Sequence, residues 1–156
     1  MRKTLFTFIF TVSLIFSTMP VYAASNLNTN TNNIPYFIET TIEDASPNNQ
    51  YGIATFASTH TVTKTKTTTA KAQDGSILYS VSITATFSYN GSISKCITCA
   101  PAAKAYSKKY SINSVSASRL SNSATTNASI TYSNGKSSID FGSSVTIRCS
   151  KNGTIS

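Results

Sequence analysis

The sequence predicts an all-β protein built as an antiparallel β-sandwich, immunoglobulin-like in the loose architectural sense. Three observations support this prediction. Apolar and polar residues alternate over long stretches, which is the pattern of strands with one buried face. Asn-Gly, Asp-Gly and Ser-Asn pairs separate these stretches, as hairpin turns do. No segment of the body shows a convincing helical pattern of apolar residues.

Two segments carry the clearest alternation. Residues 77–89 have an apolar or aromatic side chain at every odd position, and residues 139–149 have one at most odd positions. Residues 105–118 and 123–133 are weaker strand candidates, rich in Ser, Ala, Ile and Tyr. The turns that we expect between the strands are Asp74-Gly75, Asn90-Gly91, Ser121-Asn122 and Asn134-Gly135.

The first 23 residues have the three parts of a secretory signal peptide. Met1-Arg2-Lys3 is basic, residues 4–20 are uncharged, and the small residues Val21 and Ala23 stand where signal peptidase reads the chain. The uncharged run is too short and too rich in Thr and Ser for a membrane anchor. We therefore predict cleavage after Ala23 and a soluble, secreted, extracellular product.

The remaining chain divides into an acidic arm and a basic body. Residues 24–57 contain three acidic residues and no Lys or Arg, and their Asn/Thr-rich start predicts a largely disordered arm. Apolar patches at 34–41 and 51–57 could form a strand or lie against the body. We favour a flexible spacer over a propeptide. Residues 58–156 form the predicted β-sandwich domain, with eleven basic residues and two acidic ones.

The first hairpin poses a choice of register. A two-residue Asp74-Gly75 loop would place Lys64 and Lys66 on the buried face of the sheet, where unpaired ammonium groups are costly. A three-residue loop over residues 73–75, with Gly75 in the left-handed conformation, shifts the pairing by one residue. We therefore expect the longer loop, with Lys64 and Lys66 in solvent.

The second hairpin bears on the three cysteines. A two-residue Asn90-Gly91 loop pairs Cys96 with Ala85 in the core and leaves Cys99 pointing outward. Cys149 lies on the apolar face of the last strand. Strand parity thus favours a Cys96–Cys149 disulfide, with Cys99 as a free thiol or an intermolecular link. The Cys-x-x-Cys spacing also matches thiol–disulfide redox motifs, but those place the first thiol at a helix N-terminus, so we favour the structural bond.

Three motifs in residues 60–156 resemble a known group of proteins. They are the Thr63–Thr67 run, the Tyr89–Cys96 segment with its Asn-Gly turn, and the closing segment Cys149–Thr154. Together they resemble an uncharacterised family of small secreted β-rich proteins of Gram-positive bacteria, mainly clostridia and their relatives. The resemblance implies one cysteine after the Asn-Gly turn and one near the end, and Cys99 departs from that pattern. It implies no activity, substrate or catalytic residue.

The residue inventory argues against an enzyme. His60 is the only histidine, so a metal site or a nucleophile–histidine pair would have to include it, and no suitable partners stand near it in the sequence. The body contains only Asp74 and Asp140 as acidic residues, which is a poor basis for paired-carboxylate chemistry. We predict no catalytic residue, no metal and no cofactor. The alternative is a secreted enzyme or toxin-like effector with an unfamiliar site.

The basic body indicates a partner of opposite charge. Lysines such as Lys64, Lys66, Lys108 and Lys109 are dispersed along the body, and export removes them from intracellular nucleic acid. The expected partners are anionic polymers of the cell envelope or a membrane surface; the plain alternative is a soluble cationic face. Carbohydrate stacking is disfavoured because the chain has no Trp. We expect a non-enzymatic binding or structural protein, monomeric unless Cys99 links two chains.

Overall fold

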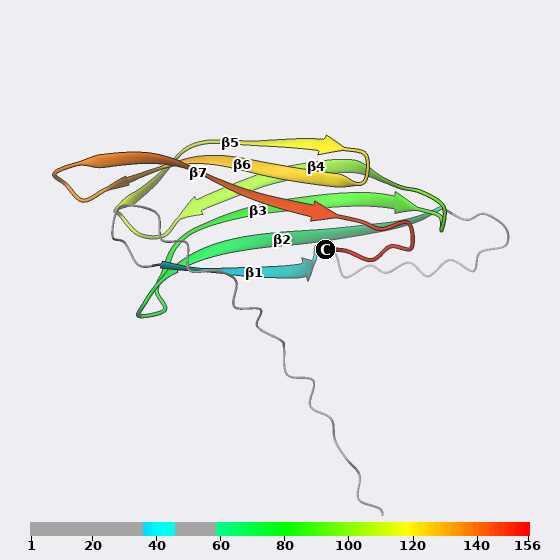
Figure 1. The fold of residues 1–156 in the computed structure, drawn as a ribbon, viewed down its shortest axis with the longest axis horizontal. Helices are drawn as coiled ribbons and strands as arrows, with labels where there is room; N and C mark the ends of the chain where they lie inside the picture. The colour runs from blue at the N-terminus through cyan, green and yellow to red at the C-terminus, as the bar shows by residue number, and fades with distance from the viewer. Residues whose placement is uncertain (1–35, 46–58) are drawn as a thin grey trace, which may run out of the picture.

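The computed structural model describes residues 36–45 and 59–156, which form seven β-strands (Figure 1). No helix occurs in these two ranges, and hence none that could cross a bilayer. The predicted signal peptide and the rest of the arm lie outside the described residues. The strands are β1 (Tyr36–Asp44), β2 (His60–Ala72), β3 (Ile77–Tyr89), β4 (Ser94–Ala105), β5 (Tyr110–Leu120), β6 (Ser123–Ser133) and β7 (Ser138–Arg148).

The strands form two antiparallel sheets, one in the order β1-β2-β3-β4 and one in the order β5-β6-β7. The all-β, antiparallel prediction is therefore confirmed. Each sheet is an up-and-down meander, because every strand pairs with its neighbour in sequence. Immunoglobulin domains use Greek-key connections instead, so any likeness to them concerns the two-sheet arrangement and not the chain path.

Three strands were not foreseen with these bounds. β1 comes from the predicted arm, where its apolar residues had offered a strand as one possibility. β4 follows the second hairpin over residues for which no strand bounds were predicted, and the weak candidate at 105–118 covers only its last residue, the turn after it and most of β5. Residues 77–89 and 123–133 form strands as predicted, and β7 matches the last alternating segment closely.

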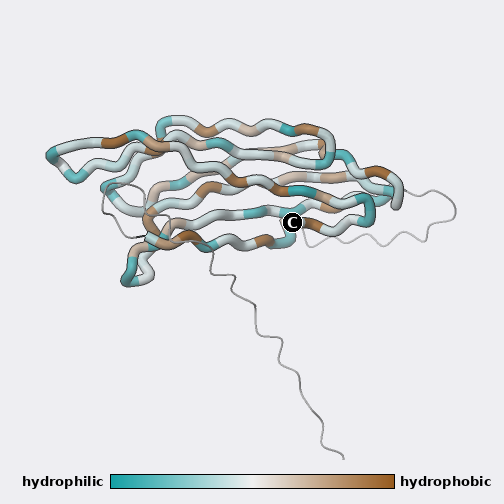
Figure 2. The backbone as a smooth tube through the Cα atoms, viewed as in Figure 1, coloured by the Kyte–Doolittle hydropathy of each residue, from teal (hydrophilic) through white to brown (hydrophobic). Residues whose placement is uncertain are grey.

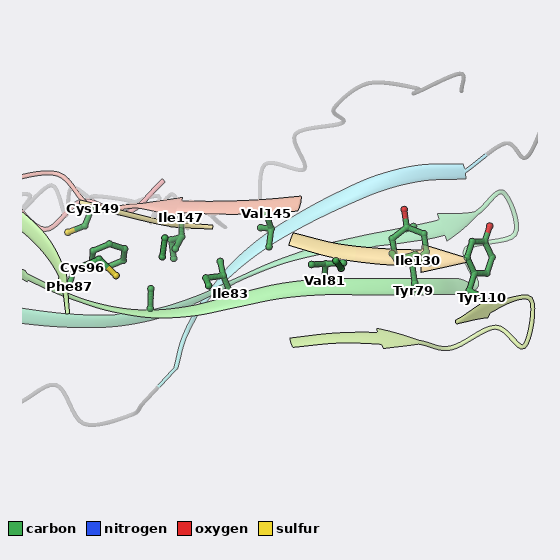
Figure 3. Packing of buried hydrophobic residues seen from close by; sticks show 14 residues of the cluster. Tyr79, Val81, Ile83, Phe87, Cys96, Tyr110, Ile130, Val145, Ile147 and Cys149 are labelled. Atoms are coloured by element: carbon green, nitrogen blue, oxygen red, sulfur yellow. The ribbon is translucent and has the colours of Figure 1, made fainter. Parts of the chain in front are cut away.

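The two sheets share one hydrophobic core (Figure 3). Thr126 of β6 is the buried polar residue within it, and its hydroxyl donates a 3.0 Å hydrogen bond across the sheets to the carbonyl of Ser82 in β3. This bond satisfies a polar group that would otherwise destabilise the interior. The largest fully buried side chains are Phe87, Ile83, Ile130, Ile147, Val81, Thr126 and Cys149.

The core has two distinct ends in Figure 3. Phe87, Cys96 and Cys149 lie at one, which we call the cysteine end, and Tyr79 and Tyr110 lie at the other, the tyrosine end. The sheets are joined by the β4–β5 turn at the tyrosine end, where the backbone N–H of Tyr106 donates to the carbonyl of Leu78. The cysteine end and the tyrosine end are therefore separated by the length of the strands.

Hydroxyl side chains dominate the outer faces of both sheets, which gives the chain its mixed hydropathy along each strand (Figure 2). Thr63 and Thr86 share a 2.9 Å hydrogen bond between their hydroxyls, and Thr65 and Thr84 share one of 2.8 Å. A third pair, Thr125–Thr146, lies on the other sheet at 2.8 Å. Cross-strand threonine pairs of this kind stabilise neighbouring strands.

The loop predicted for the first hairpin is confirmed, but the side-chain orientation that we inferred from it is wrong. The loop is Gln73–Gly75, closed by hydrogen bonds from the Ala72 N–H to the Ser76 carbonyl and from the Gly75 N–H to the Ala72 carbonyl, and Gly75 has φ 83°. A bulge between Ala70 and Lys71 then shifts the pairing back by one residue. Lys64 and Lys66 consequently pair with Ala85 and Ile83 on the inner face, and the expectation that they point outward is wrong.

These two inward lysines are only partly buried, and Lys64 has a charged partner. The β1 strand borders β2 on the side away from β3, and the Lys64 ammonium forms an ion pair with Asp44 at the end of β1. The Lys64 side chain is 24% exposed and that of Asp44 is 60% exposed. Long lysine side chains can cover apolar surface while their charge reaches solvent, which removes the cost that had argued against this register.

The second hairpin is longer than predicted. Tyr89 pairs with Ser94 instead of Ser92, so the loop spans residues 90–93, and the Asn90 side chain accepts backbone hydrogen bonds from Ser92 and Ile93. A two-residue error preserves strand parity, and Cys96 is buried as predicted, now opposite Phe87. A bulge between Thr86 and Phe87 changes the parity beyond Cys96.

Aromatic rings close the tyrosine end. Tyr79 contacts Tyr110, Phe141 and Tyr36 with ring centroids 5.5, 5.8 and 6.5 Å apart, and Tyr110 also packs on Tyr132 at 5.2 Å. Burial raises the pKa of the Tyr79 phenol, and the neighbouring Tyr36 raises it further. Burial likewise raises the pKa of Tyr110. Both phenols are thus held in their neutral form by the folded protein.

This cluster predicts a loss of stability at alkaline pH. Above about pH 10 the unfolded chain loses phenolic protons that the folded protein retains, so the contribution of these two phenols to the free energy of unfolding is constant below that pH and falls above it. Urea denaturation at neutral and alkaline pH measures the fall. Tyr79→Phe should reduce it, while Tyr106→Phe, at an exposed ring, should leave it unchanged. Equal alkaline losses in both variants would refute this assignment.

Candidate functional site

Four basic side chains surround the cysteine end of the molecule, and we call them the basic end. Lys95 stands at the start of β4, Arg119 near the end of β5, Arg148 at the end of β7, and Lys151 in the turn that follows β7. All four are exposed. The segments that carry them, residues 88–96, 119–123 and 147–156, contain no Asp or Glu. These segments therefore carry four basic side chains and no acidic side chain.

Backbone hydrogen bonds bring these segments together from distant parts of the sequence. The β5–β6 turn accepts two of them: the carbonyl of Ser121 from the N–H of Cys96, and the carbonyl of Asn122 from the N–H of Cys149. The N–H of Gly91 donates to the carbonyl of Lys151 at 2.9 Å. The positions of the basic residues are thus set by the fold and not by local sequence.

The acidic side chains of the described residues are mostly engaged elsewhere. Asp44 and Glu39 form ion pairs with Lys64 and Lys71. Asp74 accepts hydrogen bonds from the hydroxyl and backbone N–H of Ser76 at 2.7 and 2.9 Å, which lower the pKa of its carboxyl. Asp140 accepts a hydrogen bond from the Thr131 hydroxyl. None of these contacts neutralises the basic end.

The four lysines singled out from the sequence do not form one site. Lys64 and Lys66 lie on the inner face of β2, and Lys64 is already paired. Lys108 and Lys109 are exposed in the β4–β5 turn at the tyrosine end, near Lys104, whose ammonium lies 4.8 Å from the Tyr106 ring centroid. Sequence reasoning missed the basic end because its members are separated by up to 56 positions and meet only through the turns.

The three cysteines are free thiols in this structure. Cys96 and Cys149 are buried, at 3% and 0% exposure, and both lie at the same end of the core (Figure 3). The predicted bond between them is absent here, and it stays a prediction. Cys99 pairs with Ala85 and packs partly buried against the core, so the expectation that it points outward is wrong. The bulge at the Thr86–Phe87 step turns it inward.

The residues considered for catalysis lie far apart. His60 begins β2 at the cysteine end, where its ring stacks on Tyr89 with centroids 5.5 Å apart. Asp140 lies on β7 opposite Thr131, toward the tyrosine end. Within residues 36–45 and 59–156, no three His, Cys, Asp or Glu side chains gather as metal ligands would.

The tyrosines considered for sugar stacking are mostly occupied. Tyr110 is 8% exposed and Tyr132 packs against it, whereas the Tyr106 ring is 50% exposed. One exposed ring with a lysine over it is a small platform compared with the aromatic pockets that sugars and other small ligands occupy.

A scan of protein-family models, a search of curated proteins and a search of solved structures each found no match to this chain.

Proposed function

We propose that this protein is a secreted, non-enzymatic binding protein that associates with anionic polymers of the cell envelope. Its two sheets serve as a β-sandwich scaffold of loosely immunoglobulin-like arrangement, and the basic end is the contact surface. The observation that carries the proposal is the gathering of Lys95, Arg119, Arg148 and Lys151 on segments without an acidic residue. A phosphate-rich polymer matches such a surface in charge and needs no concave pocket.

The hydroxyl-rich outer faces fit this role as well. Lys95 lies opposite Ser88 and Arg148 lies opposite Ser123, so two of the four basic side chains belong to these faces, at the end where we place the contact with the polymer. Each exposed basic residue near an anionic surface contributes about 1 kcal/mol, an effect that falls off with salt. Four together support weak to moderate, salt-sensitive association.

Cosedimentation with purified Gram-positive cell walls, over a salt series, tests the proposal. Lys95→Gln, Arg119→Gln, Arg148→Gln and Lys151→Gln are combined in one variant. The matched control combines Lys104→Gln, Lys108→Gln, Lys109→Gln and Lys136→Gln, which removes the same charge from residues away from the cysteine end. The first variant should lose roughly a thousandfold in affinity at low salt, and the control much less.

Three outcomes would contradict the proposal. Equal losses in the two variants would mean that net charge alone attracts the protein and that the basic end is no site. Binding that survives extraction of the anionic polymers from the walls would move the partner to another wall component. Binding to anionic vesicles but not to walls would make the partner a membrane surface.

A further inference from the structure

The β4 bulge places two cysteines side by side on one face. Cys96 pairs with Phe87 and Cys99 with Ala85, and these two partners are successive inner-face residues of β3. Cys96 and Cys99 are therefore neighbours on the inner face, although three positions separate them in sequence. Such neighbours have Cα atoms about 6.7 Å apart. That distance is near the upper end of the ~4.4–6.8 Å range of Cα separations in disulfides, but parallel side chains keep their Cβ atoms beyond the ~3.5–4.5 Å that the bond needs. A Cys96–Cys99 bond therefore requires the β4 backbone to move, and it is strained in the finished sheet.

Cys149 approaches the same place from the other sheet. The consecutive carbonyls of Ser121 and Asn122 accept the N–H groups of Cys96 at 2.8 Å and Cys149 at 3.0 Å. The Asn122 side-chain amide also donates to the Cys149 carbonyl at 2.8 Å. The β5–β6 turn thus holds the backbones of both cysteines, and Cys149 comes into place only when β5, β6 and β7 have assembled.

The three thiols differ in access. Cys149 is fully buried and Cys96 nearly so, and burial, followed by the nearby Cys99, raises the pKa of the Cys96 thiol. Cys99 is only partly buried. Once the sheets have assembled, an external disulfide therefore meets Cys99 before it meets the other two.

We propose that Cys99 is an exchange thiol. It forms a first disulfide with Cys96, and thiol–disulfide exchange then replaces this bond with a Cys96–Cys149 disulfide. The Cys99 thiolate attacks a small external disulfide and releases one thiolate of it. The Cys96 thiolate then attacks the Cys99 sulfur, which releases the second thiolate and forms the Cys96–Cys99 bond. Finally the Cys149 thiolate attacks the Cys96 sulfur, and the Cys99 thiolate leaves. Two thiols are oxidised in total and one external disulfide is reduced.

Chain connectivity sets this order. Cys96 and Cys99 are three positions apart, whereas more than fifty separate Cys96 from Cys149. Closing the shorter loop costs less entropy, so the local bond can form before the second sheet exists. The strain of the local bond then favours its replacement once folding brings Cys149 into the core. Cys99 therefore takes part in forming the final Cys96–Cys149 bond but is not one of its two cysteines.

Refolding of the reduced protein with oxidised and reduced glutathione tests the relay. Samples are quenched in acid, alkylated and digested with trypsin. Cleavage after Lys95, Lys104, Arg148 and Lys151 puts Cys96 and Cys99 in one peptide and Cys149 in another. Early samples should contain the first peptide with an internal bond. Late samples should contain the two peptides linked, with Cys99 alkylated.

Two variants sharpen the test. Cys149→Ser should accumulate the internal Cys96–Cys99 bond. Cys99→Ser should reach the Cys96–Cys149 bond roughly tenfold more slowly, because the local first step is lost. The inference fails if no internal bond appears in the unaltered protein at any time, if Cys99→Ser oxidises at the same rate, or if Cys99 ends in a bond to Cys149 or to a second chain.

Discussion

Replacing Phe87 with alanine is expected to lower the free energy of unfolding by about 3–5 kcal/mol, because the change leaves a large cavity at the cysteine end of the core. Phe87 has 0% exposure and is the largest of the fully buried side chains. Small domains have a total stability of about 5–15 kcal/mol, so this one change removes a large share of it. Thermal unfolding followed by circular dichroism should show a midpoint lower by roughly 15–30 °C.

Phe37 provides the matched control. It lies on β1 with 42% exposure, so Phe37→Ala makes the same chemical change where a smaller part of the ring is removed from water. We expect a loss below about 1 kcal/mol. Both variants are measured with a reducing agent present, so that no disulfide contributes. Similar losses for the two phenylalanines would contradict the burial of Phe87 in the core.

Phe87 also illustrates what the sequence could predict. Residues 77–89 alternate so regularly that strand, inner face and core membership follow from periodicity alone. Turn positions followed with equal clarity, since Gly75, Gly91 and Gly135 all adopt positive φ at predicted turns. The strand with its buried face and the turn positions both depend on neighbouring residues in the sequence, so they can be predicted without knowledge of distant contacts.

The register of the strands was harder to predict from the sequence, because bulges shift it. The Gln73–Gly75 loop was predicted correctly, yet the bulge beside Ala70 reversed the facing of Lys64 and Lys66. The bulge at Thr86–Phe87 did the same to Cys99. A bulge adds one residue to a strand and flips every side chain beyond it. Its position depends on packing between the sheets, which alternation of residue types does not reveal.

The candidate site was harder still to predict from the sequence. Lys95, Arg119, Arg148 and Lys151 come to the same end because the β3–β4 turn, the β5–β6 turn and the segment after β7 are joined by backbone hydrogen bonds. Backbone groups carry no signal in residue type, so the sequence offered only a hint: Lys95 and Arg148 each immediately precede a cysteine of the core. That hint becomes informative only after both cysteines have been placed at the same end.

Gly153 holds this arrangement together, and Gly153→Ala should be strongly destabilising for the segment after β7. A Cβ at this position would lie 2.4 Å from Cζ of the Tyr89 ring, and Gly153 also has φ 85°. The substitution therefore combines left-handed strain of about 1–2 kcal/mol with an overpacking cost of about 1–3 kcal/mol. Hydrogen exchange should show faster exchange at the Gly91 and Ser156 amides, which bond to Lys151 and Arg148.

Gly135→Ala separates the two causes, because Gly135 has the same φ of 85° and nothing within 4 Å of an added Cβ. It should cost only the backbone strain, and its effect should stay in the β6–β7 turn. Tyr89→Ala combined with Gly153→Ala should recover most of the excess cost of the latter, since the obstructing ring is gone. Because Lys151 lies in the displaced turn, Gly153→Ala should also weaken cell-wall binding where Gly135→Ala does not. Equal exchange rates and equal wall binding in the two glycine variants would show that the turn does not pack on Tyr89.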